Sequence, residues 1–97
     1  MAKGYWIVLY RSISKPEQLA AYAKLSGPAI EAAGGRFLAR ASAAYAFEAG
    51  VKQRSVLTEF ESLERALAAY RSPAYQAALK LLDGAVERDF RIVEGLA

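Results

Sequence analysis

The sequence contains no cysteine and no histidine. The lack of cysteine excludes a disulfide framework and any thiolate chemistry. The lack of both residues removes the usual nitrogen and sulfur ligands of zinc and non-haem iron sites. No serine has a histidine to activate it, and no glycine-rich phosphate loop or dinucleotide fingerprint is present. We therefore expect a protein that uses no metal and no other cofactor.

Long hydrophobic runs are also missing. The apolar run near the N-terminus covers only six residues, Tyr5 to Tyr10, and Arg11 closes it. This length suits a β-strand and is too short for a transmembrane helix or for the core of a signal peptide. We expect a cytoplasmic protein that does not insert into a membrane.

Charge of one sign is not concentrated anywhere in the chain. There are 13 Lys and Arg residues against 10 Asp and Glu residues, which gives a net charge of +3. The basic residues are scattered, and acidic residues such as Glu59, Glu61 and Glu64 lie among them. A nucleic-acid-binding surface would need a basic stripe with interleaved aromatic residues. The pattern predicts solvated surface charge and no nucleic-acid partner.

The sequence does contain enough apolar residues for a hydrophobic core. Its 97 residues are 55% hydrophobic and 24% charged, as in an ordinary globular protein. This length predicts a single domain over residues 1–97. Because a chain of this size buries only a modest fraction of its surface, association with a second copy would add stability.

A helix is expected after the N-terminal strand. Ser14 is a candidate cap for it, with Pro16 in the first turn and Glu17 completing a capping box. Gly27-Pro28 predicts a kink or a break in this helix, and Gly34-Gly35 predicts its end.

The second half repeats the strand and helix plan with a hairpin in between. Arg36 to Phe47 and Gln53 to Phe60 are two expected strands, joined by a turn at residues 48–51. A second helix is expected from Ser62, with a new start at Ser72-Pro73, before a last strand around residues 90–93. The order strand, helix, strand, strand, helix, strand predicts an α+β fold. We expect the ferredoxin-like βαββαβ type, an antiparallel sheet with both helices on one face.

The first strand predicts that the sheet is covered on its second face as well. A sheet with one face in water should alternate apolar and polar residues, but residues 5–10 are apolar on both faces. Monomers usually avoid such an exposed apolar patch. We therefore expect a homodimer that packs sheet to sheet, with Trp6, Leu38 and Leu57 as candidate interface residues. The alternative is a monomer with a partly wet sheet.

Several short segments are spread in order over nearly the full length of the chain. They are Gly4-Tyr5-Trp6-Ile7, Gly34-Gly35-Arg36-Phe37-Leu38, Thr58-Glu59-Phe60, Tyr70-Arg71-Ser72-Pro73-Ala74-Tyr75-Gln76 and Ile92-Val93-Glu94-Gly95. In these segments the chain resembles the domain-of-unknown-function family 1330, within the dimeric α/β-barrel superfamily. The resemblance implies the ferredoxin-like fold and a sheet-to-sheet dimer. It implies no activity, because the family has none assigned.

The residues left for chemistry are carboxylates, arginines and tyrosines. If the hairpin tip lies at Ala49-Gly50, Arg40 faces Glu59 on the face without helices. This pair is either a cross-strand ion pair that helps to set the register or a ligand site, with Tyr10 orienting the ligand.

Three more candidates lie elsewhere in the sequence. Tyr70 and Tyr75 flank the junction of the two helical pieces, where they either pack in the core or line the mouth of a site. Glu94, at the end of the last strand, is either a ligand contact or a solvated side chain.

Three functions remain open at this point. The first is a small homodimeric protein that binds a small organic molecule. The second is a cofactor-independent enzyme, such as a monooxygenase or an isomerase, with Glu59 as the base and Arg40 steadying a developing oxyanion. The third is an interaction or stress-related module without a pocket. A pocket with convergent tyrosines and one carboxylate of shifted pKa would favour the second function, and a filled interior would favour the third.

Overall fold

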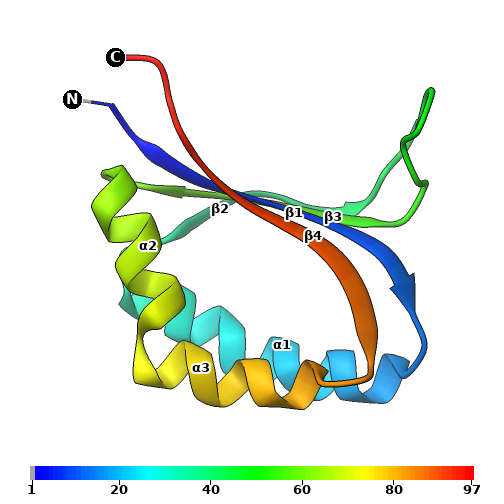
Figure 1. The fold of residues 1–97 in the computed structure, drawn as a ribbon. Coiled ribbons are helices and arrows are strands. Elements are labelled where there is room, and N and C mark those ends of the chain that lie inside the picture. The colour runs from blue at the N-terminus through cyan, green and yellow to red at the C-terminus, as the bar shows by residue number, and fades with distance from the viewer. Residues whose placement is uncertain (1) are drawn as a thin grey trace.

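The computed structural model describes residues 2–97, which form a four-stranded antiparallel sheet with helices packed on one face (Figure 1). The elements are β1 (Gly4–Ile13), α1 (Pro16–Ala32), β2 (Arg36–Ser42), β3 (Arg54–Phe60), α2 (Leu63–Arg71), α3 (Pro73–Leu79), the short 3₁₀ turn η1 (Lys80–Leu82) and β4 (Val86–Glu94). The strand order is β2-β3-β1-β4, so β1 and β3 are central. The fold is the α+β, ferredoxin-like arrangement that the sequence predicts.

Two features of α1 differ from the sequence expectation. The cap residue is Lys15, with no side-chain hydrogen bond, and the hydroxyl of Ser14 instead lies 3.2 Å and 3.1 Å from the carbonyl oxygens of Gly84 and Ala85. Ser14 thus ties the start of α1 to the segment before β4. The helix also continues through Pro28, so the expected break is absent.

The other helix boundaries follow their local sequence signals. Gly34 has a φ of 94°, the left-handed conformation that glycine adopts most easily after a helix. The hydroxyls of Ser62 and Ser72 accept hydrogen bonds from the backbone N–H groups of Arg65 and Tyr75, and so cap α2 and α3.

The hairpin is shorter, and its register differs from the predicted one. β2 ends at Ser42 rather than at Phe47, and residues 43–53 connect it to β3. Glu59 is opposite Arg36, and a bulge between Phe37 and Ala39 then moves the pairing by one residue. Arg40 consequently lies opposite Val56, and the predicted pairing of Arg40 with Glu59 is wrong.

The core lies between the helices and one face of the sheet, and it is rich in aromatic rings. Trp6 is 1% exposed, and its ring packs 5.0 Å from Tyr75 and 5.1 Å from Phe60, measured between ring centroids. Its indole N–H donates a 2.8 Å hydrogen bond to the carbonyl of Ala66 in α2. Trp6 therefore belongs to the helix-covered core, and its assignment to a sheet-to-sheet interface is wrong.

Candidate functional site

A cleft opens between α1 and the helix-covered face of the sheet. Its apolar walls come from both layers: Leu19, Ala23 and Ile30 on α1, and Trp6, Val8, Phe37 and Val56 on the sheet. Its polar residues are Tyr10, Tyr22, Ser26, Arg40, Arg54, Thr58 and Arg88. The volume is about 30 Å³, which is room for about two water molecules.

The register of the strands brings two arginines to either side of one tyrosine. Tyr10 on β1 is paired with Arg88 on β4, and Arg54 begins β3 on the other side of β1. All three side chains line the cleft. Burial raises the pKa of the Tyr10 hydroxyl above its usual value, and the two guanidinium groups only partly oppose this.

Arg88 is held by two tyrosines that come from different helices. Its Nη2 donates a 2.9 Å hydrogen bond to the hydroxyl of Tyr75 in α3, and its Nη1 donates a 3.4 Å bond to the hydroxyl of Tyr22 in α1. The two hydroxyl oxygens are 2.7 Å apart. The guanidinium also lies over the rings of Tyr22 and Phe90, at 5.4 Å and 5.0 Å from their centroids. Contacts on several sides therefore fix the position of this group.

The electrostatics of this cluster keep it cationic. Burial raises the pKa of Tyr75 far above its usual range, with Tyr22 adding to the effect, so Tyr75 stays protonated. Burial alone would lower the pKa of Arg88, but the hydroxyls of Tyr22 and Tyr75 reverse this and raise it. Arg88 is therefore charged at every physiological pH.

Two buried polar atoms in the cleft have no partner within residues 2–97. They are the hydroxyl oxygen of Thr58 and the Nε of Arg54. Thr58 as a whole is 0% exposed. Buried hydroxyl and guanidinium groups almost always have a hydrogen-bond partner, and leaving one without a partner is costly. Both residues line the cleft, so the sheet layer beside it holds two buried polar groups without partners.

Arg40 lies where the cleft meets the surface. Its side chain is exposed, and its guanidinium packs 4.2 Å from the centroid of the Phe37 ring. Both residues line the cleft. Of the residues predicted to form a site, Arg40 and Tyr10 are therefore the two that line it.

The remaining candidates lie outside the cleft. Tyr75 is fully buried and does not line the cleft itself, but it contacts the cleft residues Tyr22 and Arg88. Tyr70 packs against Trp6 and Phe90, and lines a separate hollow beside α2. Glu94 is exposed at the end of β4, opposite Gly4.

Glu59 lies on the opposite face of the sheet. Its carboxylate is 3.3 Å from the guanidinium of Arg36 and accepts a 3.4 Å hydrogen bond from the hydroxyl of Tyr5. The proposed base and the proposed oxyanion-binding arginine are therefore separated by the sheet. The site built from Arg40 and Glu59 is wrong.

The face that carries Glu59 has no helix over it within residues 2–97 (Figure 1). The apolar side chains on it include Ile7, Leu9, Leu57 and Val93, with Leu9 and Val93 43% and 41% exposed. Leu38, at the bulge, is 44% exposed. We call this the open face. Leu57 lies on it as predicted.

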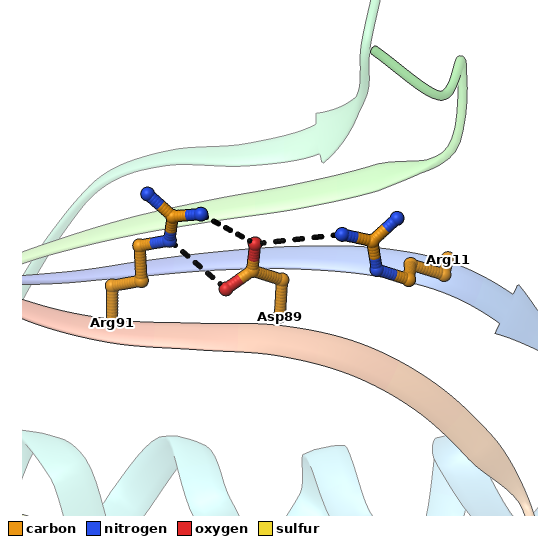
Figure 2. Close-up of polar contacts among 3 residues, drawn as sticks. All are labelled: Arg11, Asp89 and Arg91. Carbon is orange, nitrogen blue, oxygen red and sulfur yellow. Dashed lines mark hydrogen bonds and ion pairs between the residues drawn. The ribbon is translucent and has the colours of Figure 1, made fainter. Parts of the chain in front are cut away.

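The open face also carries a compact ionic cluster. Asp89 accepts two 3.0 Å hydrogen bonds from Arg91 and lies 3.8 Å from Arg11 (Figure 2). The hydrogen bonds from Arg91 lower the pKa of Asp89 below its usual value. On this face both Glu59 and Asp89 are paired with arginine.

Sequence reasoning missed Arg54, Arg88, Tyr22 and Thr58. The strand pattern could have indicated Arg54, Thr58 and Arg88, because alternate residues of a strand share one face. On β4, Arg88 shares a face with the apolar residues Phe90 and Ile92. On β3, Arg54 and Thr58 share a face with Val56 and Phe60. Polar residues inside an apolar face that is covered by helices are unusual enough to mark a site. Nothing local distinguishes Tyr22 from the other apolar-face residues of its helix.

None of the helices in residues 2–97 has the length and hydropathy to cross a membrane. Within the same range, no group of three or more Asp, Glu, His or Cys side chains could hold a metal ion.

Solved structures of the same fold come from several bacteria. A protein of unknown function from Rhodopseudomonas palustris is 21% identical, with a TM-score of 0.74 over 99% of this chain and 84% of that one. A dimeric ferredoxin-like protein of unknown function from Thermobifida fusca is 18% identical, with a TM-score of 0.68 over 98% and 92%. A candidate antibiotic biosynthesis monooxygenase from Nitrosomonas europaea is 14% identical, with a TM-score of 0.63 over 99% and 93%. These likenesses show the fold.

The family is shown by the sequence itself. No curated protein matches the chain. The model of the family described as "Domain of unknown function (DUF1330)" matches residues 3–96, which is nearly the whole chain. The chain therefore belongs to the DUF1330 family.

Proposed function

We propose that the protein is a homodimer that binds a small organic molecule in the cleft between α1 and the sheet. The observation that carries the proposal is the pair of buried donors without partners, the Thr58 hydroxyl and the Arg54 Nε. A polar atom of a bound molecule supplies what these groups lack. The apolar walls around them, such as Trp6 and Ile30, suit the body of an organic ligand.

The dimer is proposed from the open face. Its leucine, isoleucine and valine side chains are apolar, and soluble proteins usually cover such patches. The related protein from Thermobifida fusca is described as dimeric. Packing two open faces together would bury Leu57 and leave the clefts on the outer sides of the dimer.

A catalytic role has less support than binding. The base that an enzyme would need was expected at Glu59, which lies on the open face. The residues that line the cleft include no carboxylate, and the chain has no histidine. A module without a pocket is also less favoured, because the cleft is present.

The binding proposal is tested with Thr58→Val, which removes the hydroxyl and keeps the shape of the side chain. A set of small carboxylic acids, amides, phenols and alcohols is titrated into the labelled protein, and backbone amide shifts are followed by NMR. We expect shifts that centre on Thr58 and weaken in the variant. The control is Ser55→Ala, on the same strand but on the open face.

The same variant also has a stability outcome. Because the hydroxyl has no partner, Thr58→Val should leave the free energy of unfolding unchanged or raise it. Weaker binding without loss of stability supports a ligand site. Shifts confined to the open face, or no shifts with any compound of the set, would contradict the proposal.

The dimer is tested by Leu57→Lys. Light scattering should give the mass of a dimer for the unchanged protein and of a monomer for this variant, because a buried unpaired ammonium group is costly. The control is Leu25→Lys, at a 52% exposed position of α1. A monomer mass for the unchanged protein would rule the dimer out.

A further inference from the structure

We propose that the ligand is an organic anion, whose carboxylate is bound by Arg54 and Arg88 and whose apolar body lies against Trp6 and Phe37. This inference rests on the proposed function and names the chemical class of the ligand. It follows from how the arginines of the sheet are partnered on its two faces.

The arginines on the two faces of the sheet differ in whether they have a carboxylate partner. On the open face, Arg11, Arg36 and Arg91 each lie within ion-pair distance of a carboxylate. On the cleft face, Arg40, Arg54 and Arg88 have no such partner among residues 2–97, and no acidic residue lines the cleft.

This imbalance has an energetic consequence. A cation that is removed from water is costly unless an anion or hydrogen-bond acceptors compensate it. Arg54 and Arg88 are both half-buried, so water compensates them only in part. A carboxylate placed between them would restore the missing negative charge. A neutral ligand would leave the imbalance as it is.

Arg88 is organised in advance for such a ligand. A guanidinium has five N–H donors in a fixed plane, and the hydrogen bonds to Tyr22 and Tyr75 use two of them. The remaining donors are held still, so little side-chain entropy is lost when an anion binds. Tyr22 and Tyr75 are therefore positioning residues for Arg88.

The size and lining of the cleft set the shape of the ligand. A volume of about 30 Å³ admits a small planar group such as a carboxylate, and not a whole drug-sized molecule. The body of the ligand must then extend towards the surface, where Arg40 packs on the ring of Phe37. Guanidinium groups bind carboxylates with two parallel hydrogen bonds, which favours this headgroup over a single hydroxyl.

The test uses matched pairs of probes that differ in charge but hardly in shape. Acetate, hexanoate, benzoate and phenylacetate are each compared with the corresponding primary amide by calorimetric titration. We expect at least one carboxylate to bind about tenfold or more tightly than its amide, since hydrogen bonds between charged groups are the stronger ones. We also expect this advantage to shrink as sodium chloride is added, because salt screens the attraction.

Two variants separate the site from general charge effects. Arg54→Gln removes one guanidinium of the cleft and should weaken carboxylate binding about tenfold while changing amide binding little. Arg65→Gln makes the same change of charge at an exposed position of α2 and should leave both unchanged. If Arg88→Gln fails to fold because Tyr22 and Tyr75 lose their partner, Arg54→Gln still decides the matter.

The outcomes distinguish this inference from the proposed function. Equal affinity for acids and amides, with shifts at Thr58, would overturn the inference and leave the proposed function standing. Equal loss of affinity in Arg54→Gln and Arg65→Gln would also overturn it. If no acid and no amide binds, the inference is contradicted. The proposed function is contradicted as well if the phenols and alcohols of the NMR set also cause no shifts.

Discussion

The hydroxyl groups of Tyr22 and Tyr75 are hydrogen-bonded at 2.7 Å although the two residues belong to different helices, α1 and α3. Each oxygen also accepts a hydrogen bond from Arg88 on β4. Two helices and one edge strand are thus joined through three side chains. This cluster joins three elements through hydrogen bonds inside the core, so its removal should change the stability measurably.

The first prediction concerns the Tyr75 hydroxyl. Tyr75→Phe should lower the free energy of unfolding by about 1–2 kcal/mol, because it leaves a buried arginine and a buried tyrosine short of a partner. Tyr70→Phe is the matched control, since the Tyr70 hydroxyl makes no hydrogen bond within the described residues. Urea denaturation of the two variants measures the difference. Equal stability of the two variants would contradict the role given to the cluster.

The second prediction concerns the register of the hairpin. A double-mutant cycle on Arg36 and Glu59 should give a coupling free energy of about 0.2–1 kcal/mol, as for other exposed ion pairs. The same cycle on Arg40 and Glu59 should give none, because these residues lie on opposite faces of the sheet. Coupling in the second cycle and not in the first would restore the register that was expected from the sequence.

The third prediction uses two glycines in different surroundings. A Cβ at Gly4 would meet the carbonyl group of Ser62 and lie 2.9 Å from the Cα of Leu63, so Gly4→Ala should destabilise the protein by more than about 1 kcal/mol. A Cβ at Gly27 would meet nothing within 4 Å. Gly27 lies inside α1, where alanine is the better helix former, but the ring of Pro28 crowds a Cβ at the preceding residue, so Gly27→Ala should change stability by less than about 1 kcal/mol. Thermal denaturation of both variants tests the contrast, and similar effects at the two positions would argue against it.

The fourth prediction concerns alkaline pH. Burial raises the pKa of Tyr10 and of Tyr75 in the folded protein, whereas tyrosine in an unfolded chain ionises near pH 10. Their contribution to stability is therefore complete below about pH 10 and is lost as the pH rises from there towards the folded pKa values.

Two measurements check this dependence. The urea midpoint should fall above about pH 10, and the fall should be smaller in Tyr75→Phe, which lacks one of the two groups. Tyrosinate absorbance should show fewer than the six tyrosines of the chain ionising before unfolding. Ionisation of all six near pH 10 in the folded protein would contradict the prediction.

Features of the fold with local causes could be predicted from the sequence. Ser62 and Ser72 cap helices because each hydroxyl reaches a backbone N–H three residues later. The order of elements and the α+β architecture follow from such signals and from hydrophobic periodicity. Ser14 is the exception, because its hydroxyl has a carbonyl near β4 as a competing partner.

The candidate site could be predicted only in part, because its geometry depends on strand pairing. The sequence predicts Tyr10 and Arg40 as site residues, but it predicts their site on the open face, whereas both line the cleft on the helix-covered face. The predicted register assumed a regular strand and a tip at Ala49-Gly50, whereas the chain pairs Arg36 with Glu59. Arg54 and Arg88 line the same cleft but belong to strands that are far apart in sequence, β3 and β4. Only the tertiary structure brings the two side chains to this cleft.

The bulge in β2 has a consequence for comparing this chain with its relatives. In a regular strand, residues three apart face opposite sides, yet Phe37 and Arg40 both line the cleft because of the extra residue between them. A homologue without that residue would need its arginine two positions after the aromatic residue, and not three, to keep the same geometry. An alignment without a gap at Leu38 would then match Arg40 with a side chain on the other face, and true equivalents would look like substitutions.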